Sequence, residues 1–335
     1  MKDGYELGIL PLIIAIPIIA LLLDLIIGDP PNRFHPVAWI GHMIGILDNR
    51  ILRGNPAAEK IVGAFAVILP ALFFISLFTL ILALTRELFG AIIWTVASAI
   101  IFKMMFAIRS LETHTAPIAW DLRKGDLDAA REKVSMVVSR DVNNLDAPHI
   151  ISCASETVSE NLVDSVLSPM FYFGIAGVPG AILLRVVNTA DGMIGYISER
   201  HRYVGWFAAR ADDIMHYITA RLSVPFIILS LILLRKDWRR GWRAAFRDHK
   251  QTSSPNKGWP IAATAGGLGT RFEKDGYYSM GEGELSDDPT IILDTIRVMK
   301  VTSLLFFLLI LIPLFTLLGI HVQLSFEDGL LDLLR

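Results

Sequence analysis

Two long stretches of the chain, residues 61–84 and 301–320, contain no charged residue at all. The hydrocarbon core of a bilayer is about 30 Å thick, and a helix needs roughly 20 apolar residues to cross it. Similar runs at residues 7–27, 88–108 and 214–234 carry one formally charged residue each. We therefore expect an all-α, polytopic integral membrane protein, a single membrane-embedded domain with about five transmembrane helices.

Composition and charge exclude several classes of function. The chain of 335 residues is 53% hydrophobic and 19% charged, with a formal net charge of −2. A balanced charge provides no basic field to hold nucleic acid, so we expect no nucleic-acid partner. The single cysteine, Cys153, excludes an internal disulfide and a metal site built from several cysteines.

Residues 165–184 are also uncharged but contain several helix-breaking residues: Pro169, Gly174, Gly177, Pro179 and Gly180. Broken backbone at membrane depth is tolerated only where protein or a water-filled cavity satisfies its polar groups. The sequence therefore predicts a broken or re-entrant element here.

Basic residues are concentrated in residues 28–60, 109–160 and 235–300. The positive-inside tendency makes these regions cytoplasmic loops of a multi-pass cell-membrane protein, with the active site on the cytoplasmic side. This leaves two topologies open, since residues 165–184 and 214–234 either both cross or neither does. We favour a bent, partly inserted element at residues 165–184, so that residues 188–213 share one composite cytoplasmic site.

Three carboxylates, Glu156, Glu160 and Asp164, recur at every fourth position with Asn161 beside them. On a helix they form one acidic stripe, and adjacent like charges repel. Mg²⁺ would relieve this repulsion, because it favours carboxylate oxygens together with substrate phosphates. The alternative is a solvated helix face, although residues 150–167 contain no Lys or Arg to interleave with the acids.

Further candidate residues lie at the ends of the apolar segments. Ionisable groups there are costly unless they face a cavity, an interface or a partner. One group stands between two apolar segments: Asn188, Asp191, Tyr196, Glu199, Arg200, Arg210, Asp212 and Asp213. Asp29 and His35 follow the first predicted helix, and Arg140 and Asp141 follow Ser139. A turn-rich loop carries Ser254, Asn256 and Trp259. P-loop, nucleophile-elbow and zinc-protease motifs are all absent from the sequence.

Taken in order, these motifs carry a resemblance that extends over nearly the whole of residues 21–303. They are Asp24 with Gly28-Asp29-Pro30 and His35-Pro36; Ser139-Arg140-Asp141; Glu156-Thr157-Val158-Ser159-Glu160-Asn161 with Asp164; Gly177-Val178-Pro179-Gly180; Val187-Asn188-Thr189 with Asp191; Glu199-Arg200; Ala209-Arg210 with Asp212-Asp213; Ala220-Arg221-Leu222; and Ser253-Ser254-Pro255-Asn256 with Gly258-Trp259-Pro260. The ordered set resembles the adenosylcobinamide-phosphate synthases of cobalamin biosynthesis.

The resemblance implies an ATP-dependent ligase that forms an amide bond. It would join adenosylcobyric acid, a corrinoid, to (R)-1-amino-2-propanol O-2-phosphate or a close aminoalcohol phosphate, with ATP as a substrate and Mg²⁺ as the cofactor. The site residues then divide into a catalytic set of Glu156, Glu160, Asp164, Arg140, Asp141, Asp191, Asp212 and Asp213, of which the first three would hold the metal, and a substrate-binding set of Asp29, His35, Asn161, Asn188, Tyr196, Glu199, Arg200, Arg210, Ser254, Asn256 and Trp259.

The expected partners are these small molecules and membrane lipid. The resemblance leaves open an association with other membrane-bound enzymes of cobalamin assembly. A related membrane family with a regulatory role shares parts of the pattern, and ionisable residues such as Asp24, Lys103 and Arg221 in apolar segments would also suit a transporter or channel. Both remain alternatives to the enzyme.

Overall fold

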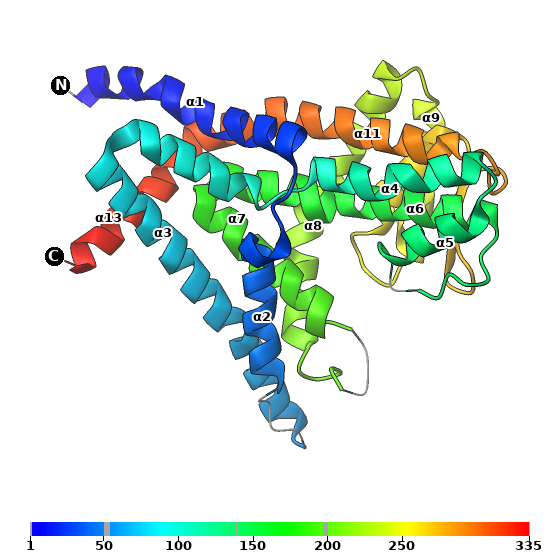
Figure 1. Ribbon diagram of the computed structural model, residues 1–335, viewed down its shortest axis with the longest axis horizontal. Helices are drawn as coiled ribbons and strands as arrows, with labels where there is room; N and C mark the ends of the chain where they lie inside the picture. The colour runs from blue at the N-terminus through cyan, green and yellow to red at the C-terminus, as the bar shows by residue number, and fades with distance from the viewer. Residues whose placement is uncertain (1, 50–53, 139, 197–199, 335) are drawn as a thin grey trace. The chain divides into compact units, whose positions relative to one another are not determined.

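The computed structural model describes residues 2–49, 54–138, 140–196 and 200–334, and these are almost entirely helical (Figure 1). The longest helices are α1 (Lys2–Ile27), α3 (Pro56–Lys103), α7 (Ser168–Ile194), α8 (Trp206–Leu233) and α11 (Thr290–Phe306). The others are α2 (Pro36–Asn49), α4 (Ile108–Arg123), α5 (Leu127–Ser135), α6 (Ala147–Leu162), α9 (Trp238–Asp248), α10 (Gly258–Leu268), α12 (Ile312–Leu314) and α13 (Ile320–Leu334), with short 3₁₀ or π turns at η1 (Asn32–Phe34), η2 (Val163–Leu167), η3 (His249–Gln251), η4 (Phe307–Leu311) and η5 (Phe315–Gly319).

Five helical stretches of the described chain are long and apolar enough to cross a membrane: Leu10–Ile27, Pro56–Arg123, Ala147–Ile194, Trp206–Leu233 and Thr290–Leu334. The prediction of an all-α membrane protein with about five such helices is confirmed. Their division differs from the expected one. The predicted helices at residues 61–84 and 88–108 fall within a single stretch, and the acidic stripe and residues 165–184 share another.

Helix α3 bends at Gly90, where φ is 80° and ψ is 178° (Figure 1). A residue with a Cβ rarely adopts this conformation, so glycine sets the position of the bend. The separate apolar runs at residues 61–84 and 88–108 predict a break between them, at Arg86 and Glu87, but both residues lie inside helical backbone just before Gly90. Charge alone does not end a helix, whereas loss of helical backbone geometry does.

Helix α7 leaves helical geometry at Ala176 and Gly177, inside the segment for which the sequence predicts a break. The amide freed there is not left without a partner, because Val178 N donates a 3.0 Å hydrogen bond to Oε1 of Gln323 on α13. A Cβ at Gly177 would lie 2.3 Å from that same oxygen. The break is thus built from a glycine and an amide side chain that satisfies the exposed backbone.

Gln323 also belongs to a buried polar network around Glu327. The Gln323 Nε2 donates to Glu327 Oε1 at 3.0 Å, and the indole N–H of Trp94 donates to the same carboxylate at 3.0 Å. Arg86 Nη1 lies 3.4 Å from the other oxygen, Oε2. Several donors and one cation therefore hold a carboxylate that is fully buried in an apolar region.

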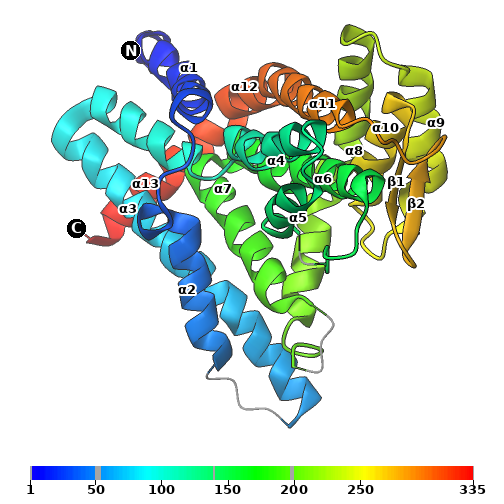
Figure 2. The same cartoon turned by 45° about the vertical axis from the view of Figure 1, so that its right-hand side comes forward.

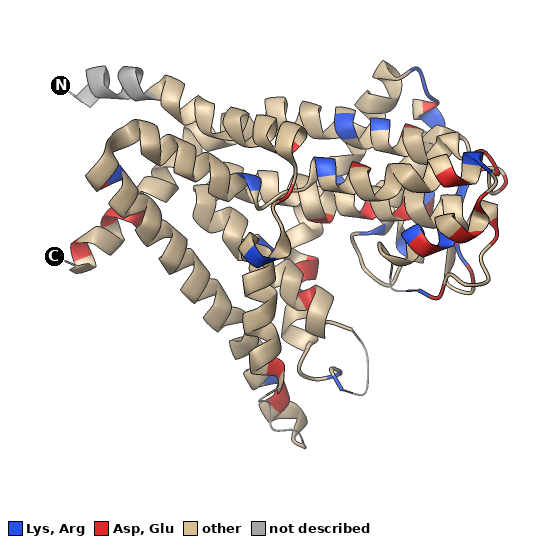
Figure 3. Cartoon of the chain, viewed as in Figure 1, with Lys and Arg blue, Asp and Glu red and all other residues tan. Residues whose placement is uncertain are grey.

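The chain divides into two compact units. Unit 1 comprises Met1–Ala107, Ser168–Met215 and Phe307–Arg335, and unit 2 comprises Ile108–Leu167 and His216–Phe306. In unit 1 the rings of Phe102, Phe173 and Phe315 stack on one another, with centroid distances of 3.6 and 4.4 Å. Charged residues are sparse along residues 10–27 of α1 and along α3 and α7, as expected for helices in contact with lipid (Figure 3).

Unit 2 holds the one element type that the sequence analysis did not anticipate. Strands β1 (Arg271–Lys274) and β2 (Tyr278–Gly281) form an antiparallel hairpin in which Phe272 pairs with Met280, beside α9 and α10 (Figure 2). Phe272 and Met280 are buried against Ile261 and Ala265 of α10. Strands of four residues are too short for a clear alternation of polar and apolar side chains.

Three helices of unit 2 begin at an aspartate N-cap. The carboxylates of Asp126, Asp146 and Asp237 accept hydrogen bonds from backbone amides three residues further on, at the starts of α5, α6 and α9. Such caps satisfy amides that have no partner within the helix. The Asp146 cap fixes where α6 begins; α6 carries Glu156 and Glu160 of the acidic stripe, and Asp164 lies in the following turn η2.

Candidate functional site

The predicted site residues divide between the two units. Unit 2 contains Arg140, Asp141, Glu156, Glu160, Asn161, Asp164, Ser254, Asn256 and Trp259, and unit 1 contains Asp29, His35, Asn188, Asp191, Tyr196, Arg200, Arg210, Asp212 and Asp213. Glu199 and Ser139 lie outside the described residues. The single composite site therefore stays a prediction, and each set is described in its own unit.

Glu156 on α6 is the most deeply buried member of the acidic stripe, with 2% of its surface exposed. Arg140 Nη2 donates to its Oε2 at 2.7 Å, and the Ser152 hydroxyl lies 2.7 Å from its Oε1. The same hydroxyl accepts a 2.7 Å hydrogen bond from the backbone N of Glu273 on β1. The carboxylate is thus linked both to a cation and to the hairpin.

Tyr278 on β2 completes the environment of Glu156, with its phenol donating to Oε2 at 2.5 Å. Burial, and after it the Glu156 carboxylate, raise the pKa of Tyr278, so the phenol keeps its proton. Burial acts against the charge of Arg140, but the carboxylate outweighs it and raises the pKa of Arg140. Tyr278 was not predicted from the sequence, because no local pattern connects a hairpin residue with α6.

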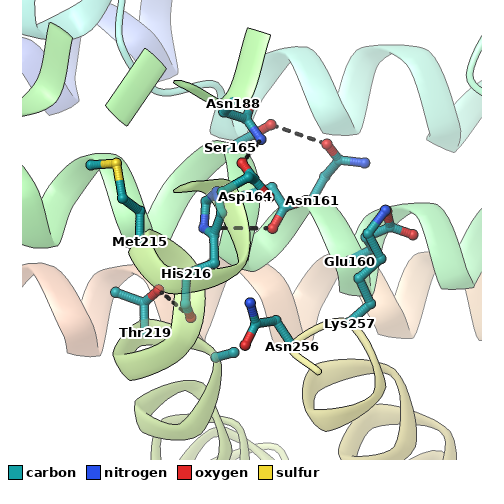
Figure 4. A network of polar contacts seen from close by, with 12 residues as sticks. Glu160, Asn161, Asp164, Ser165, Asn188, Met215, His216, Thr219, Asn256 and Lys257 are labelled. Atoms are coloured by element: carbon teal, nitrogen blue, oxygen red, sulfur yellow. Dashed lines mark hydrogen bonds and ion pairs between the residues drawn. The ribbon is translucent and has the colours of Figure 1, made fainter. Parts of the chain in front are cut away.

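The other two members of the stripe have basic neighbours of their own. Glu160 Oε1 lies 2.6 Å from Nζ of Lys257, and Asp164 Oδ1 lies 3.7 Å from Nδ1 of the buried His216 (Figure 4). Lys257 stands just before α10 and His216 lies on α8. These two partners were also missed, although Lys257 stands inside a motif that the sequence analysis singled out.

Amide and guanidinium groups border the stripe on the side of the loop before α10. Arg221 Nη1 donates to Oδ1 of the buried Asn256 at 2.9 Å, and the guanidinium lies 3.4 Å from the centre of the Tyr217 ring. Asn161 accepts a 3.0 Å hydrogen bond from the Ser165 hydroxyl (Figure 4). Cationic and amide donors therefore gather in unit 2 near carboxylates.

Trp259 is a packing residue in this arrangement. Its ring stacks on His249 with a centroid distance of 3.7 Å, and only 9% of the residue is exposed. Ser254 Oγ accepts a hydrogen bond from Asn256 N at 3.3 Å, and Asp141 accepts one from Asn143 N at 3.0 Å. Ser254 and Asp141 thus shape their own turns.

The stripe does not form a cluster of three metal ligands. Within the described part of the chain, no three His, Cys, Asp or Glu side chains are placed to hold one metal ion together. Mg²⁺ commonly binds one or two carboxylates and takes its other ligands from substrate phosphates and water. The assignment of Mg²⁺ to Glu156, Glu160 and Asp164 therefore stays a prediction.

In unit 1, Asp29 belongs to a partly buried ionic cluster at the end of α1. Lys103 forms ion pairs with Asp29 and with Asp24, whose Oδ1 lies 3.5 Å from Nζ, and His35 Nε2 lies 3.8 Å from Asp29. Burial raises the pKa of Asp29, but His35 and Lys103 outweigh it and hold that pKa well below its usual range. Asp29 is therefore ionised at neutral pH.

Asn188 and Asp212 are brought together by α7 and α8. Asn188 Nδ2 donates to Asp212 Oδ1 at 3.3 Å, and Arg185 Nε donates to the carbonyl oxygen of Met105 at 2.5 Å. Asp191 lies one turn beyond Asn188 on α7. A Cβ added at Gly195 would lie 2.0 Å from Oδ1 of Asp191. A glycine is required for this close approach.

The remaining predicted residues of unit 1 lie further along the same region. Arg200 Nη2 forms a 2.8 Å ion pair with Asp48 on α2, and His201 contacts the same carboxylate at 3.2 Å. The exposed Arg210 lies 3.8 Å from the partly buried Asp213. Tyr196 is 57% exposed. Arg200 therefore has an evident structural role, whereas Tyr196 has a side chain open to its surroundings.

Comparison with known proteins gives one consistent result. Residues 17–305 match the family model described as CobD/Cbib protein. A probable cobalamin biosynthesis protein CobD of Methanothermobacter thermautotrophicus is 39% identical over 88% of this chain and 95% of its own length. Cobalamin biosynthesis proteins CobD of Dehalococcoides mccartyi and Klebsiella pneumoniae are 39% and 37% identical over 81% and 76% of this chain, and over 87% and 80% of their own lengths. No solved structure matches.

Proposed function

Because the chain belongs to the CobD/CbiB family, whose relatives are named cobalamin biosynthesis proteins, we propose that it is an ATP-dependent synthase of that pathway. It joins a carboxylate of adenosylcobyric acid to the amine of (R)-1-amino-2-propanol O-2-phosphate, or a close aminoalcohol phosphate, and gives adenosylcobinamide phosphate. The reaction takes place at the membrane, since five helical stretches of the described residues are long and apolar enough to span it.

One observation supports the phosphate chemistry more than any other. In unit 2 the less buried end of the acidic stripe is Glu160 with Asp164, and Lys257 pairs with Glu160. Arg221 on α8 donates to Asn256, the residue just before Lys257. Glu160 is 29% exposed in its side chain and Lys257 39%, so both can exchange their mutual ion pair for a ligand. Carboxylates for a hard cation and cations for phosphoryl oxygens are what ATP-dependent acyl activation requires.

The donor set of Glu160 and Asp164 fits Mg²⁺ that completes its coordination with phosphate oxygens. When bound, Mg²⁺ would neutralise charge on the phosphoryl group being transferred. Lys257 and Arg221 would bind phosphate oxygens and orient them. Glu156, fully engaged by Arg140, Tyr278 and Ser152, would position the neighbouring turn of α6 rather than act as a ligand.

The reaction balances through an acyl phosphate. A carboxylate oxygen of adenosylcobyric acid forms a bond to the γ-phosphorus of ATP, and ADP leaves. The amine nitrogen then forms a bond to the acyl carbon, inorganic phosphate leaves, and the nitrogen loses a proton. In unit 1, Asp29, His35, Asn188, Asp191 and Asp212 are the proposed contacts to the polar parts of the substrates.

A turnover experiment tests this proposal. The purified full chain in detergent is given ATP, Mg²⁺, adenosylcobyric acid and the aminoalcohol phosphate. We expect adenosylcobinamide phosphate, ADP and phosphate in equal amounts. When the amine is replaced by its alcohol, we expect no amide and no ADP beyond a stoichiometric burst from acyl phosphate formation. A folded protein that forms no amide, yet moves corrinoid into proteoliposomes, would favour the transporter instead.

A further inference from the structure

Helix α9 presents an exposed aromatic row. Trp238, Trp242 and Phe246 are 40%, 45% and 51% exposed, and they recur at every fourth position along its eleven residues. Trp242 and Phe246 contact each other with a centroid distance of 4.8 Å. Exposed large aromatic side chains in a continuous row are unusual on a surface that faces only water.

Two arginines form a second row beside the aromatic one. Arg239 and Arg243 each follow a tryptophan by one position, about 100° further round the helix, and both are exposed. Arg240 and Arg247 differ from them, since they form ion pairs with Asp237, Asp248 and Glu282. For Arg239 and Arg243 no ion pair is found among the described residues, and Arg239 lies over the ring of Trp238 at 5.2 Å.

The third face of α9 is fixed against the protein. Its buried residues are Gly241, Ala244, Ala245 and Asp248. A methyl group at Gly241 would lie 2.8 Å from Leu231 Cδ1 and 2.9 Å from the carbonyl oxygen of Ala263. This close packing on the end of α8 and on α10 leaves the helix no freedom to turn its aromatic row inward.

The position of α9 in the chain places it near a membrane surface. The candidate span in α8 ends at Leu233, and α9 begins at Trp238. Ile232 and Leu233, at the end of that span, are 46% and 58% exposed, so the apolar surface of α8 leads directly toward the aromatic row. The backbone turns tightly between the two helices, since Lys236 N donates to the carbonyl oxygen of Leu231 at 2.8 Å, so α9 begins close to the end of the span.

We propose that α9 is an interfacial helix that binds anionic phospholipid. Trp238, Trp242 and Phe246 lie at the boundary of the acyl chains, where aromatic side chains are favoured. Arg239 and Arg243 bind the phosphates of the headgroups, for which a guanidinium provides a planar pair of donors. A second copy of the chain would instead place identical positive rows against each other.

Spin labels on single cysteines measure the depth of the helix. Phe246→Cys tests the aromatic row, and Asp275→Cys, at an exposed position in the hairpin turn, is the control. The native Cys153 is buried and can remain in place. In nanodiscs of phosphatidylcholine and phosphatidylglycerol, we expect the label at 246 to collide more with oxygen than with a water-soluble nickel chelate, and the label at 275 to do the reverse.

Two results would overturn the proposal. A label at 246 as open to the nickel chelate as the one at 275 would place α9 in water. A label shielded from both relaxers would show that protein, a partner or a second copy, covers the row.

A charge experiment tests the headgroup class separately. In the variant Arg239→Gln/Arg243→Gln, the preference for spin-labelled phosphatidylglycerol over phosphatidylcholine should fall by up to about 25-fold, since each basic residue near an anionic surface contributes about 1 kcal/mol, roughly fivefold in affinity. The control Lys124→Gln/Arg202→Gln removes two exposed charges from other segments and should leave the preference unchanged. An unchanged preference in the α9 variant would refute the anionic assignment.

Discussion

The phenol oxygen of Tyr278 lies 2.5 Å from Oε2 of Glu156, a residue 122 positions earlier in the chain. With the bond from Glu273 N to the Ser152 hydroxyl, this contact fastens both strands of the hairpin to the acidic face of α6. The hairpin therefore positions Glu156, the first carboxylate of the stripe, and Glu156 in turn positions Arg140 through their ion pair.

Tyr278→Phe removes the hydrogen bond and keeps the ring. We expect a stability loss of about 1–3 kcal/mol, because a buried carboxylate oxygen loses one donor. We also expect a several-fold lower rate of amide formation, since Glu156 and Arg140 can then shift. Thermal unfolding and turnover of the purified variant measure the two effects.

Tyr277→Phe is the matched control, because Tyr277 is the neighbouring residue and is 75% exposed. It should behave as the parent protein in both assays. Equal stability and rate for Tyr278→Phe would mean that the hairpin does not organise this site.

Asp29→Asn tests the ionic cluster at the end of α1. The pKa of Asp29 is lowered in the folded protein, so ionised Asp29 contributes stability above the pKa of the unfolded chain, about 3.9. That contribution declines as the pH falls through the folded pKa. The parent protein should unfold at a higher temperature than Asp29→Asn at neutral pH, and the difference should shrink below about pH 4.

Asp128→Asn provides the comparison, since the Asp128 side chain is 92% exposed and pairs with Arg131 at the surface. Its unfolding temperature should follow that of the parent protein at every pH. A constant difference between the parent protein and Asp29→Asn down to low pH would contradict the role given to the Asp29 charge.

Gln323→Leu tests how the break in α7 is satisfied. The substitution leaves the amide of Val178 without its acceptor, and it takes one donor from Glu327. We expect destabilisation by about 1–3 kcal/mol for the buried unsatisfied amide alone. Ser325→Ala on the same helix removes only an exposed hydroxyl bond and should change little. Equal unfolding temperatures for both variants would show that another group satisfies the break.

The membrane helices and the family could be predicted from the sequence because both depend on local patterns. Uncharged runs give the spans, and ordered motifs give the CobD/CbiB family, which the comparisons confirm. The break in α7 was foreseen for a similar reason, since Gly177 and Pro179 alter backbone geometry locally. Gln323, which completes the break, is distant in sequence and carries no such signal.

The partners of the acidic stripe could not be predicted for the same physical reason. Arg140, Lys257 and His216 come from three separate segments, and only the packing of α6 against them brings each to its own carboxylate. From the sequence alone, relief of the expected repulsion between these acids was assigned to a metal ion, whereas the folded chain also provides basic side chains.

The central claim, that Glu160 and Lys257 belong to a site for Mg²⁺ and the phosphates of ATP, is tested most directly by the Mg²⁺ dependence of turnover in Glu160→Gln. Glu112→Gln is the matched control, because Glu112 forms an ion pair of the same 2.6 Å length with Lys300. We expect Glu160→Gln to remain folded, to lose at least about tenfold in rate and to need more Mg²⁺, since one ligand charge is gone. A folded Glu160→Gln protein with the rate and Mg²⁺ dependence of Glu112→Gln would contradict the account.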